Sequence, residues 1–280
     1  LALGCACGYL LGGRYPMEWA PVDAGEHSGV EESKARLLAL GVPDYVLNDL
    51  TAEDLAACDG AILVVVDVDD YPVNSGRRVS HSYWIGGERH TNIHTVYDVK
   101  ELRITGVGVE LPGERWMLIQ HFLWTTPPGF CGTESIQLWP AYRAGMEGWR
   151  SGGALTGRVL YDEGGQTYAA PYCFLGEQTF AYDSLFWGKQ IRDDLFAAFS
   201  LPRDGENCRG YVAYPIERVR DGYIVDGWFN YTHQQSWMQY PVMTAMENQM
   251  TNGWNWEGVF YEVSTALQFY QNEEGVRLLG

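Results

Sequence analysis

The chain from residue 61 onward carries the two-residue period of β-strands, and this pattern constrains the fold more than any other feature. Residues 62–66 (ILVVV) form a continuous aliphatic run, as expected of a strand that is covered on both faces. Residues 116–122 place apolar side chains at both parities, which again indicates two covered faces. Glycine and proline clusters at 126–129 and 151–153 mark loops. Short strands with turn signals about every ten residues are typical of β-sandwiches and barrels, so we expect a mostly β protein.

A similar pattern recurs after an offset of ninety positions. Residues 107–112 (VGVELP) and residues 197–202 (AAFSLP) both alternate apolar side chains and both end in Leu-Pro. Few of the aligned positions are identical, so a chance likeness between two β-rich stretches is the alternative. We interpret the pattern as an internal duplication, in which Val109 and Phe199 would occupy equivalent core positions of two β-sandwich-like units.

Helix signals are concentrated before residue 60. Residues 30–40 carry acidic side chains in the first turn and are followed by Gly41, which favours a helix end. Thr51 begins a Thr-Ala-Glu-Asp sequence that resembles a capping box. The apolar residues of this segment would pack on the β-rich part. The chain is therefore divided into an export-signal remnant and linker (1–29), a short helical segment (30–59), a first β-sandwich-like unit (60–150) and a second such unit (151–280).

The first residues, 1–13 (LALGCACGYLLGG), read as the end of a secretory signal. Ala2-Leu-Gly-Cys5 partly matches a bacterial lipobox, in which the cysteine takes a lipid, although Ala2 stands where a leucine is usual. We expect an exported or cell-surface protein, with Cys5 as the lipidation residue. An ordinary cleavable signal and a truncated gene fragment are the alternatives. As a general type, the chain resembles exported proteins of Gram-positive bacteria, and this resemblance implies no activity.

Composition excludes several classes of partner. The formal net charge is −17, and the sequence holds no basic run. Binding to nucleic acid or electrostatic docking on anionic lipid needs clustered Lys and Arg, so neither is expected. No apolar run reaches the roughly 18–20 residues of a membrane span. Membrane attachment is therefore expected only through an N-terminal lipid.

Metal and cofactor signals are weak. The histidines of the first unit and one nearby aspartate could surround a zinc ion, but separate surface histidines explain their spacing equally. They are His81, His90, His94, His121 and Asp98. The acidic run at 67–70 suggests calcium but lacks the glycine and closing glutamate of an EF-hand loop. The six cysteines have no metal-type spacing, and Cys173 could pair with Cys208 in an oxidising compartment. We assign no metal site and no cofactor.

The strongest candidate for a binding site is a stretch that mixes aromatic rings with amide and imidazole groups. Rings offer flat contact area to sugar faces, whereas Asn, Gln and His can bond hydroxyl groups. The alternative is a packed β-core with amphipathic rings at its rim. The ligand-binding residues that we predict are Trp228, Tyr231, His233, Gln235, Trp237, Tyr240, Trp254 and Trp256.

Catalytic motifs are absent from the sequence. It contains no Gly-x-Ser-x-Gly, no P-loop and no dinucleotide fingerprint. Glu110, Glu134, Asp162 and Asp226 could supply the carboxylate pair of a glycosidase, but so acidic a chain offers such candidates by composition alone. Our first hypothesis is an exported or surface-anchored bacterial binding module, non-enzymatic, that recognises a glycan or a surface protein. A secreted hydrolase acting on carbohydrate is the second, and a structural envelope protein is the third.

Overall fold

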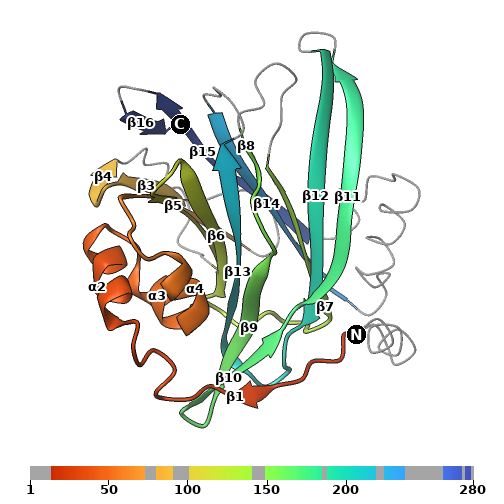
Figure 1. Ribbon diagram of the computed structural model, residues 1–280. Coiled ribbons are helices and arrows are strands. Elements are labelled where there is room, and N and C mark those ends of the chain that lie inside the picture. Colours follow the sequence, from red (N-terminus) through yellow and green to blue (C-terminus); the bar gives the residue numbers. More distant parts are fainter. Residues whose placement is uncertain are drawn as a thin grey trace.

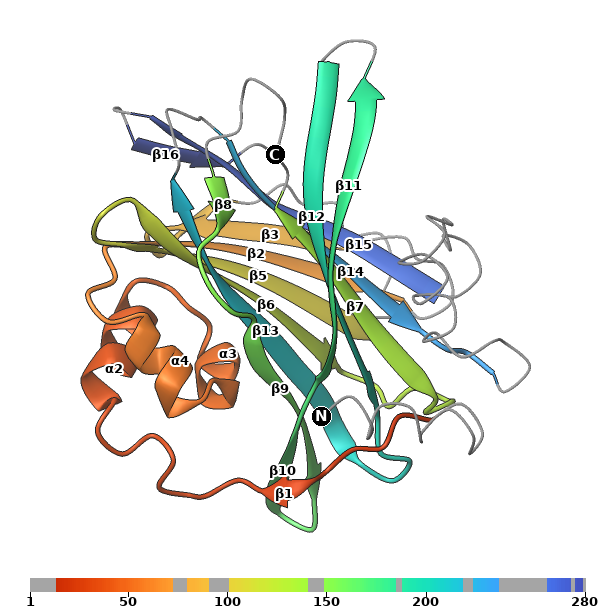
Figure 2. The ribbon, with the colours of Figure 1, turned by 45° about the vertical axis from the view of Figure 1, so that its right-hand side comes forward.

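The computed structural model describes residues 14–72, 80–90, 101–140, 149–184, 188–218, 224–236, 261–272 and 275–278. Two antiparallel sheets and three short helices make up the described residues, with the helices on one side of the molecule (Figures 1 and 2). The expectation of a mostly β protein with a short helical segment in front is confirmed. No helix among the described residues is long and apolar enough to cross a bilayer.

The first sheet is the larger one. Its strands, in spatial order, are β1 (Ala20–Pro21), β10 (Gln166–Pro171), β9 (Thr156–Glu163), β13 (Glu206–Arg218), β6 (Arg115–Trp124), β5 (Leu102–Leu111), β2 (Leu63–Tyr71), β3 (Ser80–Ile85) and β4 (Glu88–His90), and β8 (Trp149–Ser151) pairs with one end of β13. The second sheet has the order β11 (Cys173–Ser184), β12 (Gly188–Ser200), β7 (Thr133–Pro140), β14 (Ile224–His233), β15 (Tyr261–Asn272) and β16 (Gly275–Leu278).

The two sheets pack face to face around an aromatic core. Alternate residues of β6, including Trp116 and Phe122, are buried against inward residues of the second sheet. The Phe122 ring stacks on Phe199 of β12 at a centroid distance of 5.3 Å and lies 5.0 Å from the Tyr231 ring of β14. Large rings bury 150–250 Å² each as a typical value, so such contacts dominate the energy of a core. The described strands therefore form a β-sandwich.

The helices cover the other face of the first sheet. They are α2 (Glu31–Ala39), α3 (Asp44–Asp49) and α4 (Ala52–Ala57). Thr51 caps α4 as expected, because its side chain accepts a hydrogen bond from the Asp54 backbone N–H at 3.1 Å. Leu47 and Leu55 of the helices share a buried cluster with Val107 and Ile119 of the sheet. The predicted packing of this segment on the β-rich part is confirmed, and the molecule has three layers.

The sheet topology corrects the predicted division into tandem units at residue 150. Strand β13 lies between β9 and β6, and β7 lies between β12 and β14, so both sheets mix strands from the two halves. Val109 faces the helices from β5, whereas Phe199 faces the inter-sheet core from β12. The two positions are not equivalent. Their shared pattern has a local cause, since β5 ends directly before Pro112 and β12 ends two residues before Pro202, and proline cannot donate to a strand ladder.

Candidate functional site

The aromatic stretch on β14 is divided by strand alternation. Phe229, Tyr231 and His233 are buried on the side of the inter-sheet core, and Tyr231 and His233 are 0% and 1% exposed. The prediction that Tyr231 and His233 line a binding surface is therefore wrong, because their parity places them inside the sandwich. Asn230 and Thr232 take the opposite parity and lie on the outer face of the second sheet.

The other predicted ligand-binding residues are distributed differently. Trp228 is on β14, where it is the register partner of Trp139 on β7. Gln235 is exposed just after the end of β14. Trp237, Tyr240, Trp254 and Trp256 lie outside the described residues.

A buried carboxylate–imidazole pair holds the end of β14 to β7. Glu134 and His233 are direct register partners, and His233 Nδ1 lies 2.8 and 3.0 Å from the two Glu134 carboxylate oxygens. The Trp124 ring packs edge-on against the His233 ring at 5.0 Å, and Trp124 Nε1 donates to Tyr231 Oη at 2.9 Å. Burial, followed by the nearby Glu134 charge, raises the pKa of Tyr231 well above its ordinary value. These groups satisfy one another inside the core and fix this end of the strand.

The residue after β14 continues this attachment. The Thr133 backbone N–H donates to Gln234 Oε1 at 3.0 Å, and Gln234 Nε2 donates to the Ser236 carbonyl at 3.1 Å. A Cβ at Gly132 would lie 2.5 Å from Gln234 Oε1, so a larger residue here would displace this amide. The start of β7 and the exit from β14 are thus locked together.

The connection from β14 to β15 begins and ends at one point of the sheet. His233 and Tyr261 are register partners, so residues 234–260 leave and return at adjacent strand positions. This connection carries Trp237, Tyr240, Trp254 and Trp256. The connection that carries these aromatic residues is therefore attached at both ends to the second sheet, next to the Glu134–His233 pair.

Polar side chains continue from this point along the outer face of the second sheet. Ser135 pairs in register with Thr232, and Gln137 with Asn230. Gln137 Nε2 donates to Asp194 Oδ2 at 2.6 Å. Ser135 Oγ, Asn230 Oδ1 and Thr232 Oγ1 are buried and have no hydrogen-bond partner among the described residues. Buried polar atoms are normally bonded, so this face, here called the polar face, retains hydrogen-bonding capacity.

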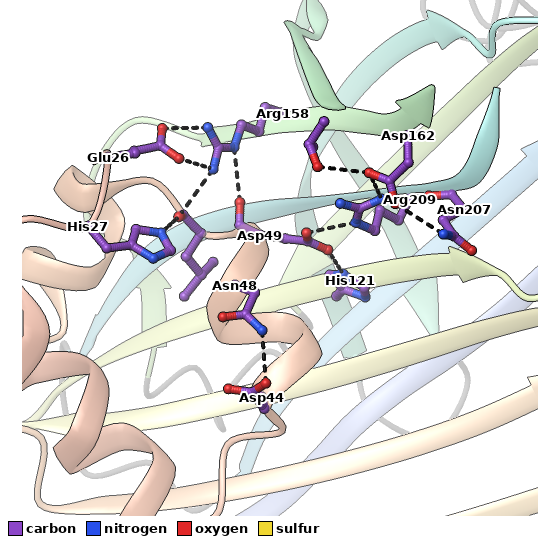
Figure 3. A network of polar contacts seen from close by, with 12 residues as sticks. Glu26, His27, Asp44, Asn48, Asp49, His121, Arg158, Asp162, Asn207 and Arg209 are labelled. Atoms are coloured by element: carbon purple, nitrogen blue, oxygen red, sulfur yellow. Dashed lines mark hydrogen bonds and ion pairs between the residues drawn. The ribbon is translucent and has the colours of Figure 1, made fainter. Parts of the chain in front are cut away.

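A second polar cluster lies between the helices and the first sheet (Figure 3). Asp49, at the end of α3, accepts hydrogen bonds from Arg209 Nε at 2.7 Å and from His121 Nε2 at 2.8 Å. Arg209 Nη1 also donates to Asp162 on β9 at 3.0 Å. Arg158 donates to the Glu26 carboxylate at 2.6 and 2.8 Å and to the Asp49 carbonyl at 2.9 Å. These contacts tie α3 and the segment before it to β6, β9 and β13.

The electrostatics of this cluster match a structural role. Burial would raise the pKa of Asp49, but the hydrogen bond and charge of His121 and the Arg209 guanidinium together lower it below its ordinary value. The Asp49 and Asp162 carboxylates raise the pKa of Arg209 against the opposing effect of burial. A carboxylate and the histidine that it orients also supply two of the three members of a catalytic triad. Here His121 Nδ1 is buried without a hydrogen-bond partner, so no described nucleophile completes a triad.

The carboxylates considered for glycosidase chemistry do not converge among the described residues. Glu134 is paired with His233 in the second sheet, and Asp162 is paired with Arg209 in the first sheet. Glu110 lies on β5 and Asp226 on β14, in different sheets. A glycosidase needs two carboxyl groups that flank one bond of an accessible substrate.

The metal and disulfide candidates are resolved in part. No group of three His, Cys, Asp or Glu side chains that could hold a metal occurs in the described part of the chain, and His94 and Asp98 lie outside it. The acidic run considered for calcium is a buried part of β2, where Asp70 accepts a hydrogen bond from Arg103 Nε at 2.9 Å. Cys173 is disulfide-bonded, whereas Cys208 is a free, buried cysteine, so the pairing of these two is not made. Burial raises the pKa of Cys208 to about 12, which removes it as a nucleophile at neutral pH.

Comparisons with known proteins give no family. No family model matches the chain, and no curated protein matches it. Among solved structures, the chain is similar to collagen adhesin (CNA) from S. aureus, with 7% identity and a TM-score of 0.24 over 62% of this chain and 75% of that one. It is also similar to a structure described as manganese lipoxygenase of Gaeumannomyces graminis with part of a zonadhesin of Komagataella pastoris, with 8% identity and a TM-score of 0.27 over 79% of this chain and 84% of that one. Both TM-scores are low, and neither likeness carries a conclusion about this chain.

Proposed function

We propose that this protein is a non-enzymatic binding module that recognises a glycan through the connection 234–260. The observation that carries the proposal is the register pair His233–Tyr261, which holds both ends of this aromatic connection at the adjacent ends of two interior strands, β14 and β15. Binding residues are commonly carried on loops that a rigid scaffold positions. The connection combines four Trp and Tyr rings with several Asn and Gln side chains, which suits stacking on sugars and bonding to hydroxyl groups.

Two further features support recognition of a polyhydroxylated ligand. The polar face begins at the strand positions where the connection is anchored, and it carries hydroxyl, amide and carboxylate groups. The buried histidines of both clusters are hydrogen-bonded to buried carboxylates. An enzyme is expected to gather titrating groups in one accessible pocket, so binding fits this arrangement better than hydrolysis.

The proposal places the protein outside the cell or on its surface, with Cys5 as the modified residue. The motive is the signal-like and lipobox-like sequence at 1–13. Mass spectrometry of the mature N-terminus tests this part. A lipid on Cys5 is the expected result, and a cytosolic full-length product or cleavage after Cys7 would contradict lipidation.

The binding site is tested with Trp237→Ala and Trp254→Ala. Each variant should lose on the order of 2 kcal/mol of binding free energy, roughly thirtyfold in affinity, because it removes a half-desolvated stacking ring. Both variants should melt close to the parent. The measurements are melting curves and fluorescence titrations with cello-, chito- and galacto-oligosaccharides and with a peptide panel.

Trp116→Ala is the matched control, because Trp116 is fully buried in the inter-sheet core. This control should lose about 3–5 kcal/mol of folding stability. If Trp237→Ala and Trp254→Ala behave like Trp116→Ala and no oligosaccharide binds to the parent, the rings are part of the core and the proposal is wrong. Binding of a peptide in place of an oligosaccharide would assign this site to a protein partner.

A further inference from the structure

One edge of the second sheet differs from the other sheet edges. The edge strands β1, β4 and β16 contain two, three and four residues, whereas β11 contains twelve. Within the described residues, β11 pairs only with β12 and forms the end of the sheet order. A long edge presents a row of backbone N–H and C=O groups that can pair with another chain.

Much of this edge stands away from the rest of the sheet. Strand β12 pairs with β7 only from Leu195 to Ser200, whereas its pairing with β11 continues to Gly188. A register irregularity between Phe174 and Gly176 marks the place where β11 leaves the body of the sheet. Figures 1 and 2 show β11 and β12 extending together beyond the other strands. This extension consists of residues 176–184 of β11 and residues 188–194 of β12.

The sequence of β11 carries less edge protection than that of its neighbour β12, with Glu177 and Asp183 as its charged residues. Natural proteins discourage edge pairing with short strands, with Lys or other charges and with Pro. Residues 173–184 (CFLGEQTFAYDS) contain no Lys, Arg or Pro, whereas residues 188–194 (GKQIRDD) contain four charged side chains in seven. Among the described edge strands, β11 therefore combines the greatest length with the absence of Lys, Arg and Pro.

We propose that β11 is a docking edge that accepts an extended segment of a partner protein as an added antiparallel strand. Main-chain pairing of this kind supplies affinity, and alternate side chains supply selectivity. The segment should be flanked by basic residues, since β11 carries Glu177 and Asp183 as its charged residues and the whole chain has a net charge of −17. The same charge disfavours a second copy of this chain as the occupant. This proposal does not depend on glycan binding.

The test uses two synthetic 12-residue peptides of alternating Thr and Val, one flanked by lysines and one by glutamates. The lysine-flanked peptide should bind at least tenfold more tightly at low salt, and it should protect β11 amides from hydrogen exchange. Thr179→Pro and Phe180→Pro are the paired variants. Adjacent residues direct their N–H groups to opposite sides of a strand, so one variant removes a donor from the open edge and the other removes one from the ladder with β12.

The variant that removes the open-edge donor should lose peptide binding at least tenfold while the β12 ladder keeps its exchange protection. Equal binding of both peptides, or full binding by both proline variants, would overturn the proposal. Concentration-dependent dimerisation of the parent that the same variant abolishes would also overturn it, in favour of a second copy. Trp237→Ala and Trp254→Ala should bind the lysine-flanked peptide like the parent, which separates this site from the glycan site.

Discussion

At the scale of single residues, the buried charges are held by partners from distant parts of the sequence. Asp49 is on a helix, and its partners His121 and Arg209 are on two strands of the first sheet. Glu134 meets His233 across the second sheet. A buried ion pair is weak evidence for net stabilisation, but removing one member leaves the other unpaired and is costly.

Asp49→Ala should therefore destabilise the protein by about 3–5 kcal/mol at pH 7. Asp44→Ala is the control on the same helix, because Asp44 is exposed and its replacement should cost about 0.5 kcal/mol. Urea unfolding of both variants and the parent measures these differences. Equal losses in the two variants would show that the Asp49 pairing contributes nothing to stability.

The same carboxyl sets a direction for pH dependence. The folded protein holds the pKa of Asp49 below its ordinary value. The contribution of Asp49 to folding stability is therefore complete above the pKa of this carboxyl in the unfolded chain, which is about 4. It is lost as pH falls through the lower pKa of the folded protein. Below pH 4 the parent should lose stability more steeply than Asp49→Asn, which has no carboxyl to protonate. Parallel curves for the two proteins would contradict this assignment.

At the scale of single elements, the alternation of side chains along a strand predicts which face of the sheet a residue occupies. It does not predict which strand lies beside it. His233 shares its parity with Phe229 and Tyr231, and Glu134 shares its parity with Ile136 and Leu138, so both buried positions were readable from the sequence. A charged or imidazole group at a core parity indicates a buried pair. The pairing partner was not readable, because any strand with a suitable face satisfies the same pattern.

Strand β9 offers a test of how closely the strands of the first sheet approach one another. Gly157 has a φ of +132°, and a Cβ there would lie 2.1 Å from the Tyr211 carbonyl oxygen of β13. Gly157→Ala should lower the free energy of unfolding by about 3 kcal/mol or more. The added Cβ would collide with the neighbouring strand, and the positive φ is unfavourable for alanine. Gly164→Ala is the control in the adjacent turn. It has a φ of +59° and open space around the position, so the cost should be about 1–2 kcal/mol.

Thermal and urea unfolding of the two glycine variants measure this difference. Equal destabilisation would mean that β9 and β13 can separate freely at Gly157. A larger effect at Gly157 would confirm that backbone contact, and not the positive φ alone, limits this position.

At the scale of the whole molecule, the sequence predicts the β-rich class, the helical segment and the packing of that segment on the β-rich part. It does not predict the order of strands, since the two sheets draw their strands from both halves of the chain. The similarity between residues 107–112 and residues 197–202 reflects the local chemistry of two strands. Pairing between strands that are distant in the sequence decides the topology. For the candidate site, the sequence identified the aromatic connection, and the structure added its anchor at His233 and Tyr261.

The central claim is that the connection 234–260 binds the ligand while the sandwich supports it. Because His233 and Tyr261 are already paired, residues 237–260 can be replaced by a short Gly-Ser turn without separating β14 from β15, and Gln234 keeps its bond to Thr133. The decisive measurement compares the parent with this shortened variant by oligosaccharide titration and by urea unfolding. The account predicts binding by the parent, at least a thirtyfold loss in the variant and an unfolding free energy within about 1 kcal/mol of the parent. Unchanged oligosaccharide binding in the shortened variant would contradict it.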